Sequence, residues 1–379
     1  MTDLAAKSLA DGSAPPERPA LAALFGRLLF TTRFMTIWIA AGVLLVVCQI
    51  FAPETLSSTS MSATLLPFGS VVAVVALGQM LVIMMGGIDL SMAATISLLA
   101  NLLVGTAQGS GDRLPYALAV VLFWAIVIGL VNGFLIAVIE LNPLIVTLAT
   151  SYVIAGITTE YRVGNANNTS VPDSLAETLY IDKVFGINTS FWLVLVLVLL
   201  VGLLLRSTGP GRKFQAVGAN RRAAWMAGIK VRSYVVASYV LASIAGGVAA
   251  VMLSAALVSP GATPGDRYLL GPVAAVVLAG ASLTGGLASP MSTWLAAFFV
   301  TVLNQMLKVL GLPVNSQPIV FGIAIVLGML ISGDRIAELI GRLLVIRPGL
   351  RSMIDETSTS PPASATPTTP AGTTTSGGP

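Results

Sequence analysis

Long apolar runs alternate with short polar connections over most of the chain. Ten such runs can be traced, at residues 35–51, 61–85, 92–107, 115–138, 143–158, 191–205, 234–258, 270–283, 291–310 and 317–331. An α-helix rises 1.5 Å per residue, so about 20 apolar residues cross the roughly 30 Å hydrocarbon core of a bilayer. The pattern predicts an all-α membrane protein with about ten transmembrane helices. Its shorter runs allow tilted or partial spans.

The charges between the runs predict an orientation. The connection from residue 206 to residue 232 holds seven basic residues and no acidic one, namely Arg206, Arg212, Lys213, Arg221, Arg222, Lys230 and Arg232. Basic connections stay on the cytoplasmic side of a membrane, so we expect this one to be cytoplasmic. Alternation across ten spans then places both termini in the cytoplasm, and four basic residues flank the spans at each end. The connection 159–190, which is richer in acids, becomes external.

Three regions follow from this layout. Residues 1–34 form a cytoplasmic N-terminal segment, partly disordered, with prolines at 15, 16 and 19. Residues 35–332 form the transmembrane domain. Residues 333–379 form a cytoplasmic C-terminal segment with a Thr/Pro/Ser-rich tail that has too little apolar surface to offset the entropy of ordering. The polar lead of 34 residues is longer than the charged region of a signal peptide, so the first apolar run is expected to be an uncleaved helix.

Composition supports lipid as the solvent of most side chains. Of the 379 residues, 55% are hydrophobic and 9% are charged, and the mean hydropathy is +0.90. Charged residues make up about a quarter of a typical soluble domain. The basic residues lie in the connections, so the net charge of +4 does not indicate a nucleic-acid partner.

The residue inventory excludes several kinds of site. There is no histidine and a single cysteine, Cys48, which excludes intrachain disulfides, His/Cys metal sites and Ser-His or Cys-His catalysis. The phosphate-loop motif G-x-x-x-x-G-K followed by Ser or Thr is also absent from the sequence. We therefore expect neither an enzyme nor a bound cofactor on this chain. If ATP drives its function, ATP and Mg²⁺ bind another subunit.

A polar interruption lies between the second and third runs. It contains Gly86, Gly87, Asp89 and Ser91. An ionised carboxylate at the bilayer centre costs about 2.5–3.5 kcal/mol, so Asp89 needs a partner, water or a position near the interface. The glycines permit non-helical backbone, and Asp89 or Ser91 can cap the next helix. The pattern predicts a broken or re-entrant helix. Its new helix start either donates N–H groups towards a solute pathway or forms a capped turn that positions two helices.

Two helix-packing features follow the interruption. Gly129 and Gly133 have the GxxxG spacing that lets helix backbones approach closely, and Asn132 beside them can hydrogen-bond to a neighbouring helix. We interpret this group chiefly as packing.

The next polar group stands at the start of the fifth run. Asn142 can cap the helix that begins at Pro143. Thr147 and Thr150 share one helix face, where they either line a polar path or bond back to their own helix. Together with the interruption and Asn132, these residues are the candidates for a translocation pathway.

The basic connection contains a short predicted helix. The residues of interest are Gly218, Asn220, Arg222, Ala223, Ala224 and Gly228. Asn220 can cap this helix and Gly228 can end it. A short helix flanked by arginines can dock into a groove on a cytoplasmic partner; the alternative is an interfacial helix that lies on anionic lipid.

These motifs, in this order, resemble the ribose-type permeases of ATP-binding-cassette importers. The resemblance rests on residues 87–91, Asn132-Gly133, Asn142-Pro143 with residues 145–148, and residues 218–231. Residues 274–280, 282–283 and 285–286 and Asn304 extend it, so that it covers about residues 60–335.

The resemblance implies a set of partners and a location. It implies a permease subunit in the bacterial inner membrane that carries a small sugar or sugar-like solute from periplasm to cytoplasm. A cytoplasmic ATP-binding subunit, a periplasmic solute-binding protein and a second permease chain, expected to be a second copy, would complete the importer. Residues 218–231 would form the helix that couples it to the ATP-binding subunit.

The sequence departs from the family at three places. Trp225 and Met226 are bulkier than expected in the coupling segment, residues 92–94 read Met-Ala-Ala, and the C-terminal tail has no counterpart.

Three functions from other classes compete with this interpretation. An ion-coupled secondary transporter usually buries several ionisable relays. Here Asp89 and Glu140 are the acids near membrane depth before the external connection. A channel-like or structural membrane protein and an intramembrane hydrolase are further alternatives, the last weakened by the lack of histidine.

Overall fold

The computed structural model describes residues 35–164, 170–313, 318–323 and 326. The predictions for the segments 1–34 and 333–379, and for most of the apolar run 317–331, lie outside the described residues. Within the described residues, five helices are long and apolar enough to cross a membrane: Ser58–Met84, Gly111–Ala137, Pro143–Val163, Thr189–Ser207 and Val231–Leu257. The all-α membrane class is confirmed.

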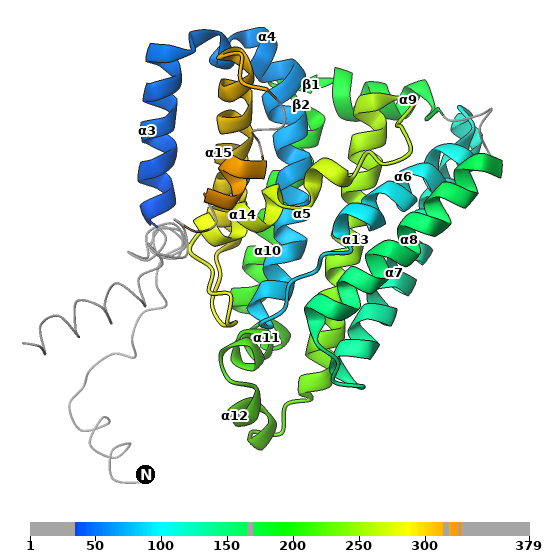
Figure 1. The fold of residues 1–379 in the computed structure, drawn as a ribbon, viewed down its shortest axis with the longest axis vertical. Helices are drawn as coiled ribbons and strands as arrows, with labels where there is room; N and C mark the ends of the chain where they lie inside the picture. Colours follow the sequence, from blue (N-terminus) through cyan, green and yellow to red (C-terminus); the bar gives the residue numbers. More distant parts are fainter. Residues whose placement is uncertain (1–34, 165–169, 314–317, 324–325, 327–379) are drawn as a thin grey trace, which may run out of the picture. The chain divides into compact units, whose positions relative to one another are not determined.

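The described part of the chain is almost entirely helical (Figure 1). Its elements are α3 (Met35–Phe51), η2 (Pro53–Leu56), α4 (Ser58–Ser60), η3 (Met61–Leu65), α5 (Leu66–Met84), α6 (Met92–Ala107), η4 (Gly111–Arg113), α7 (Leu114–Ala137), α8 (Pro143–Gly164), α9 (Asp173–Ala176), η5 (Glu177–Ile181), β1 (Lys183–Val184), β2 (Ile187–Asn188), α10 (Thr189–Ser207), α11 (Gly209–Ala219), α12 (Arg221–Met226), α13 (Val231–Leu257), η6 (Asp266–Tyr268), α14 (Gly271–Leu278) and α15 (Pro290–Val309). The two strands form an antiparallel hairpin in which Lys183 pairs with Asn188.

Most helix bounds follow the apolar pattern closely. Helices α3 and α6 coincide with the predicted runs, whereas α8 extends six residues beyond its run, to Gly164. Threonines at the end of the run and at the start of the extension bond within the helix. Thr158 donates to the Ile154 carbonyl (2.8 Å) and Thr159 to the Ala155 carbonyl (3.0 Å). Threonines that bond back in this way do not end a helix.

The apolar run 270–283 is not a spanning helix. It contains α14, which has eight residues and therefore measures about 12 Å. Gly280, Gly285 and Gly286 follow with φ of +88°, +98° and +107°. Glycine enters this region of backbone conformation without steric cost. The helix ends there although the sequence stays largely apolar. Since this run falls short and run 317–331 lies mostly outside the described residues, the predicted ten spans are not confirmed.

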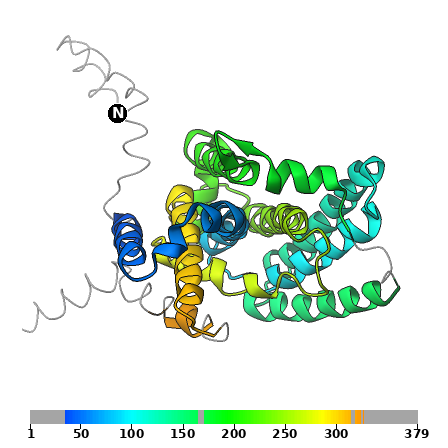
Figure 2. The ribbon, with the colours of Figure 1, turned by 90° about the horizontal axis from the view of Figure 1, so that it is seen from above.

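Helices α5 and α13 stand side by side at the centre, with α7 and α8 on one side and α15 and α3 on the other (Figure 2). Small residues allow the close contact. A Cβ atom at Gly78 of α5 would lie 2.9 Å from the Ala245 Cβ of α13, and one at Gly133 of α7 would lie 2.8 Å from the Val236 Cα. Such contacts drive helix association where apolar burial gives no advantage over lipid. Gly133 thus packs as the GxxxG spacing predicted.

The two ends of the helices carry different structures. Helices α11 and α12 lie at one end, and α4, α9 and the hairpin lie at the other (Figure 1). Near this second end, one Arg162 nitrogen on α8 donates to the Asn101 side-chain oxygen of α6 (2.7 Å) and to the carbonyls of Pro260 (2.9 Å) and Gly261 (3.2 Å). One side chain therefore ties α8 to α6 and to the connection that follows α13.

Candidate functional site

The carboxyl end of α5 is held by partners from two distant segments. The Met84 carbonyl accepts a hydrogen bond from the Gly286 N–H (3.0 Å), and the Met85 carbonyl accepts one from the Arg221 guanidinium. Within the turn, Gly86 N–H donates to the Ile83 carbonyl (2.8 Å) and Gly87 N–H to the Val82 carbonyl (3.2 Å). This is the Schellman motif, which places a left-handed residue after the helix. Gly86, with φ of +73°, is that residue.

Three backbone segments meet at this point without side chains between them. We call Gly86, Gly218, Gly285 and Gly286 the glycine junction. A Cβ atom at Gly285 would lie 2.9 Å from the Gly218 carbonyl oxygen and 3.1 Å from that of Met84, and one at Gly86 would lie 3.3 Å from that of Thr284. The end of α5, the end of α11 and the loop after α14 are therefore packed backbone against backbone.

Residues 85–91 run as non-helical chain from the end of α5 to the start of α6, so the predicted break is present (Figure 1). Asp89 is 2% exposed. One carboxylate oxygen accepts from the Ser91 N–H (2.8 Å) and the Ser91 hydroxyl (2.6 Å), and the other has no partner among the described residues. Asp89 thus accepts a hydrogen bond from the N–H of Ser91, the residue that precedes α6. The expected side-chain cap is therefore not formed, because Asp89 bonds Ser91 itself and no described side chain caps the first N–H groups of α6.

Gln79, a residue of α5, bonds the backbone of the same turn. With its amide oriented to satisfy both groups, Gln79 accepts from the Asp89 N–H (3.1 Å) and donates to the Asp89 carbonyl (3.3 Å). Gln79 is 1% exposed. A buried amide that bonds both backbone groups of one residue fixes that residue's position, because leaving either group unpaired is unfavourable.

A chain of polar side chains leads from the turn to α7 and α8. The Asn132 amide nitrogen donates to the Ser91 hydroxyl (2.9 Å), and the Thr150 hydroxyl donates to the Asn132 oxygen (2.7 Å). The Thr147 hydroxyl lies 2.9 Å from the Pro143 carbonyl and 3.3 Å from the Ile88 carbonyl, so it can donate to its own helix or to the break. We call Asp89, Ser91, Asn132 and Thr150 the polar chain.

Asn142 stands apart from the polar chain. Its side-chain oxygen accepts from the Leu144 N–H (2.9 Å), and the residue is exposed. It caps α8, as expected from its place before Pro143. Its neighbour Glu140 has φ of +65° and forms an ion pair of 3.0 Å with Arg232.

The basic connection folds as two short helices. The Asn220 side chain accepts from the Ala223 N–H (3.0 Å) and caps α12. Gly228, with φ of +77°, ends it through a second Schellman motif, in which Gly228 N–H donates to Trp225 O (2.9 Å). Ala224 is 4% exposed, whereas Trp225 and Met226 are each 70% exposed. The helix packs its small residue inward and presents its two large ones outward.

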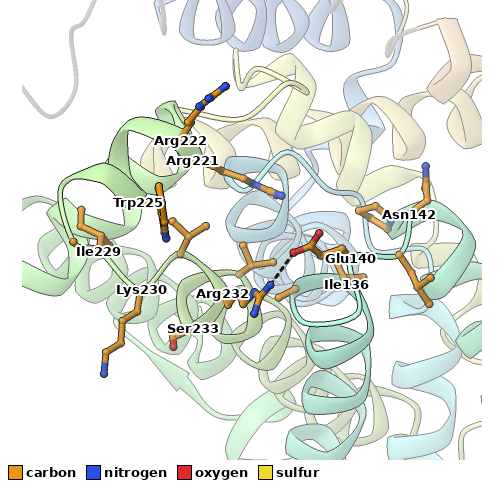
Figure 3. Close-up of a pocket in the computed structure, with 16 residues that line it drawn as sticks. Ile136, Glu140, Asn142, Arg221, Arg222, Trp225, Ile229, Lys230, Arg232 and Ser233 are labelled. Atoms are coloured by element: carbon orange, nitrogen blue, oxygen red, sulfur yellow. Dashed lines mark hydrogen bonds and ion pairs between the residues drawn. The ribbon is translucent and has the colours of Figure 1, made fainter.

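A pocket of about 1410 Å³ opens between α12, the start of α13 and the turn from α7 to α8 (Figure 3). Its charged lining residues are Glu140, Arg221, Arg222, Lys230 and Arg232. Arg221 and Arg222 point in different directions, Arg221 across the pocket and Arg222 away from it (Figure 3). Arg221 bonds the end of α5. Arg222, which is exposed, has no bonded partner in the part of the chain that the structure describes.

The structure thus brings together Gly86, Gly87, Asp89, Ser91, Asn132 and Thr147 at the break and places Gly218 against it. Sequence reasoning missed Gln79, Arg221 and Tyr239. The Tyr239 hydroxyl of α13 is buried directly against Gly87. No local signal marks these residues, because each meets the break through contacts between distant segments.

The site joins distant parts of the fold through hydrogen bonds and backbone contacts. Among the described residues, no three His, Cys, Asp or Glu side chains cluster as metal ligands. Cys48 is buried beside Leu44 and Leu65, as a packed apolar residue. Through these contacts the exposed helix α12 is linked to the turn between α5 and α6, and side chains of α7 and α8 bond to the same turn.

Comparisons with known proteins identify similar chains. The sequence model of a family described as "Branched-chain amino acid transport system / permease component" matches residues 61–329. The ribose import permease protein RbsC of Bacillus subtilis (strain 168) is 33% identical over 304 residues, which cover 78% of this chain and 91% of that protein. RbsC of Escherichia coli (strain K12) is 31% identical, covering 70% of this chain and 83% of that protein.

A third relative is the autoinducer 2 import system permease protein LsrD of Escherichia coli O9:H4 (strain HS). It is 31% identical and covers 73% of this chain and 86% of that protein. No solved structure matches the chain. The resemblance found in the sequence is confirmed over nearly the same residues.

Proposed function

The chain belongs to the permease-component family of the branched-chain amino acid transport system, and from that premise we propose that it is the membrane-spanning subunit of an ATP-driven importer. The observation that carries the proposal is the position of α12. This helix exposes Trp225 and Met226 for a partner while Arg221, in the same helix, holds the end of α5. If a separate ATP-binding subunit drives the transport movement, the permease needs an exposed helix for docking that is also bonded to a movable part of the bundle.

The solute is a small sugar or sugar-like molecule. Two relatives reported above are named for ribose import and one for autoinducer 2 import, and each aligns over most of its length. We therefore assign a ribose-sized, polyhydroxylated solute to this chain. None of these relatives is named as an ion-coupled transporter, so the ion-coupled alternative gains no support from them.

The ATP-binding subunit binds at α12. The sequence has no phosphate loop, so ATP and Mg²⁺ belong to that subunit. Large aromatic residues that fill a partner's pocket dominate the energetics of interfaces, and Trp225 is the most suitable anchor on this helix. Arg222 adds a positive charge beside it, which favours an acidic rim on the partner.

Orientation and the remaining partners follow from the charges. The seven basic residues between 206 and 232 support a cytoplasmic position for α11 and α12. The opposite end then faces the periplasm of a bacterial inner membrane and receives the solute-binding protein. The four basic residues that flank the spans at each end favour a cytoplasmic position for both termini, and a second copy of the chain completes the transmembrane unit.

The break relays the movement of α12 to the bundle. Displacement of α12 acts on Met85 and the glycine junction, and the polar chain then joins the break to α6, α7 and α8. A transporter alternates between outward- and inward-facing states by moving such units as rigid bodies about a break. In this account Asp89 is a structural acceptor rather than an ion-coupling group.

The pairing with an ATP-binding subunit can be tested by co-purification. The tagged chain is co-expressed with candidate ATP-binding subunits and purified as wild type, as Trp225→Asp and as Phe185→Asp. Phe185 is 92% exposed in the hairpin at the opposite end and serves as the matched control. We expect the ATP-binding subunit to be lost with Trp225→Asp and retained with Phe185→Asp. Retention by both variants would contradict docking at α12.

A further inference from the structure

Arg221 makes a contact that its neighbours in the basic connection do not make. It is the first residue of α12, and its guanidinium donates to the carbonyl of Met85, 136 residues earlier in the chain. Met85 is 2% exposed and follows the last residue of α5. A helix leaves its last carbonyls without partners inside the helix, and a cation placed there also interacts favourably with the helix dipole. The contact is therefore a second cap on α5, supplied by another helix.

The end of α5, next to the Arg221 contact, is closely packed against two other backbone segments. The Met84 carbonyl is bonded to Gly286, and Gly218 at the end of α11 lies against the same carbonyl. These glycines bring the backbone of α11 and of the loop after α14 against the end of α5, so no side chain lies between those segments. Because close-packed interiors transmit strain, a movement of α12 acts directly on residues 84–86.

The break itself can respond to such a movement. Gly86 and Gly87 follow Met85 directly, and the Tyr239 hydroxyl packs on Gly87 without a hydrogen-bond partner among the described residues. Tyr239 lies within electrostatic range of both Arg221 and Asp89. Asp89 in the break and Arg221 on α12 thus both act electrostatically on one buried hydroxyl.

We propose that Arg221 is the positioning residue through which α12 moves the break: its bond to the Met85 carbonyl carries displacement of α12 to Asp89 and the polar chain. This rests on the proposed function, in which an ATP-binding subunit displaces α12. Arg222 has a different role, since it points away from the break (Figure 3) and is available to the partner. Adjacent arginines on one short helix therefore divide transmission and docking between them.

The test separates docking from transmission in the complete importer. The chain, its ATP-binding subunit and its solute-binding protein are reconstituted in liposomes, and three quantities are measured: co-purification of the ATP-binding subunit, ATP hydrolysis, and uptake of labelled ribose. Uptake per ATP hydrolysed is the readout of transmission. The variants are Arg221→Met, which keeps an unbranched apolar stem but has no hydrogen-bond donor, and Lys213→Met, which removes a charge from the exposed surface of α11.

We expect Arg221→Met to retain the ATP-binding subunit and ATP hydrolysis while uptake per ATP falls about tenfold, the range of a typical coupling free energy between sites. Arg221→Lys, which keeps one charged donor without the planar fork, should recover part of the loss. Lys213→Met should match the wild type in all three quantities. A loss confined to uptake per ATP is a readout that a general folding defect would not give.

Each contrary outcome has a distinct meaning. Wild-type uptake per ATP in Arg221→Met would overturn the role of Arg221 while leaving the proposed function intact. Loss of the ATP-binding subunit from this variant would make Arg221 a docking contact instead. Failure of the wild-type chain to retain any ATP-binding subunit would overturn the proposed function itself. If Arg221→Met does not accumulate in the membrane, Arg221→Gln is used, because its shorter neutral side chain cannot reach Met85; a wild-type ratio would again overturn the inference.

Discussion

The amide nitrogen of Asn132 donates a hydrogen bond of 2.9 Å to the hydroxyl of Ser91. Asn132 is fully buried in α7, and Ser91 is the residue before α6. The same asparagine accepts from Thr150 of α8 at 2.7 Å. One side chain therefore fixes the break against two helices. This contact connects the helix bundle to the segment that the importer has to move.

Asn132→Leu should destabilise the protein by about 1–3 kcal/mol, because the buried Ser91 hydroxyl loses a donor and the partly buried Thr150 hydroxyl loses its acceptor. Thr150→Val removes only the outer bond and should cost less. The comparison is made by thermal unfolding of the purified variants in detergent. Equal unfolding temperatures for Asn132→Leu and the wild type would mean that the polar chain does not contribute to stability.

Gly87→Ala tests the contact between the break and α13. The added Cβ would overlap the Tyr239 hydroxyl, whereas its other neighbours, Val82 and Pro143, lie at ordinary contact distances. Overpacking of this kind costs about 1–3 kcal/mol. The Tyr239 hydroxyl has no partner among the described residues, so the double variant Gly87→Ala/Tyr239→Phe should recover most of the loss. If unfolding temperatures show no recovery, the hydroxyl is not the clashing group.

Gly86→Ala tests the left-handed turn after α5. Gly86 has φ of +73°, and a side chain there costs about 1–2 kcal/mol. Gly156, within α8, is the matched control because an added Cβ would meet nothing within 4 Å. Gly156→Ala should be neutral or stabilising, since alanine suits a helix interior better than glycine. The unfolding midpoint should therefore fall for Gly86→Ala and stay unchanged or rise for Gly156→Ala.

Arg162→Ala tests the tie at the opposite end of the helices. The change removes the partner of the Asn101 oxygen and of two backbone carbonyls. Leaving such groups unpaired costs about 1–3 kcal/mol when they are buried. Arg162→Lys keeps the charge but has no planar fork, and it should restore only part of the stability. Limited proteolysis of the connection after α13 provides the readout, and unchanged cleavage rates in Arg162→Ala would argue against this tie.

The apolar pattern predicted helix bounds well where a polar interruption in the sequence coincides with a non-helical backbone. Helix α6 matches its run because the break precedes it and because Gln108 and Gly109 follow it with φ of +50° and +73°. The run 270–283 was misjudged because Gly280 stops α14 inside a stretch that is still apolar. Hydropathy reports the solvent of a segment, and it does not report where the helix within that segment ends.

The sequence singled out some residues of the candidate site but not how they assemble. Local chemistry singled out Asp89, Ser91 and Asn132, because polar side chains in apolar surroundings need partners. It singled out Arg222 and missed Arg221, because nothing in the sequence distinguishes the roles of two adjacent arginines. Only the packing of α12 beneath α5 directs one to the Met85 carbonyl and the other away from it. Likewise, the glycine junction joins three segments that lie 67 or more residues apart in the sequence.

The most direct test of the account is solute uptake by liposomes that contain the chain with its ATP-binding subunit and solute-binding protein. We predict that labelled ribose or a related sugar accumulates only when ATP and both partners are present, and that Trp225→Asp abolishes uptake while membrane insertion stays normal. Uptake by the chain alone, driven by an imposed proton or sodium gradient without ATP, would contradict the importer account. Asp89 would then be the coupling-site candidate.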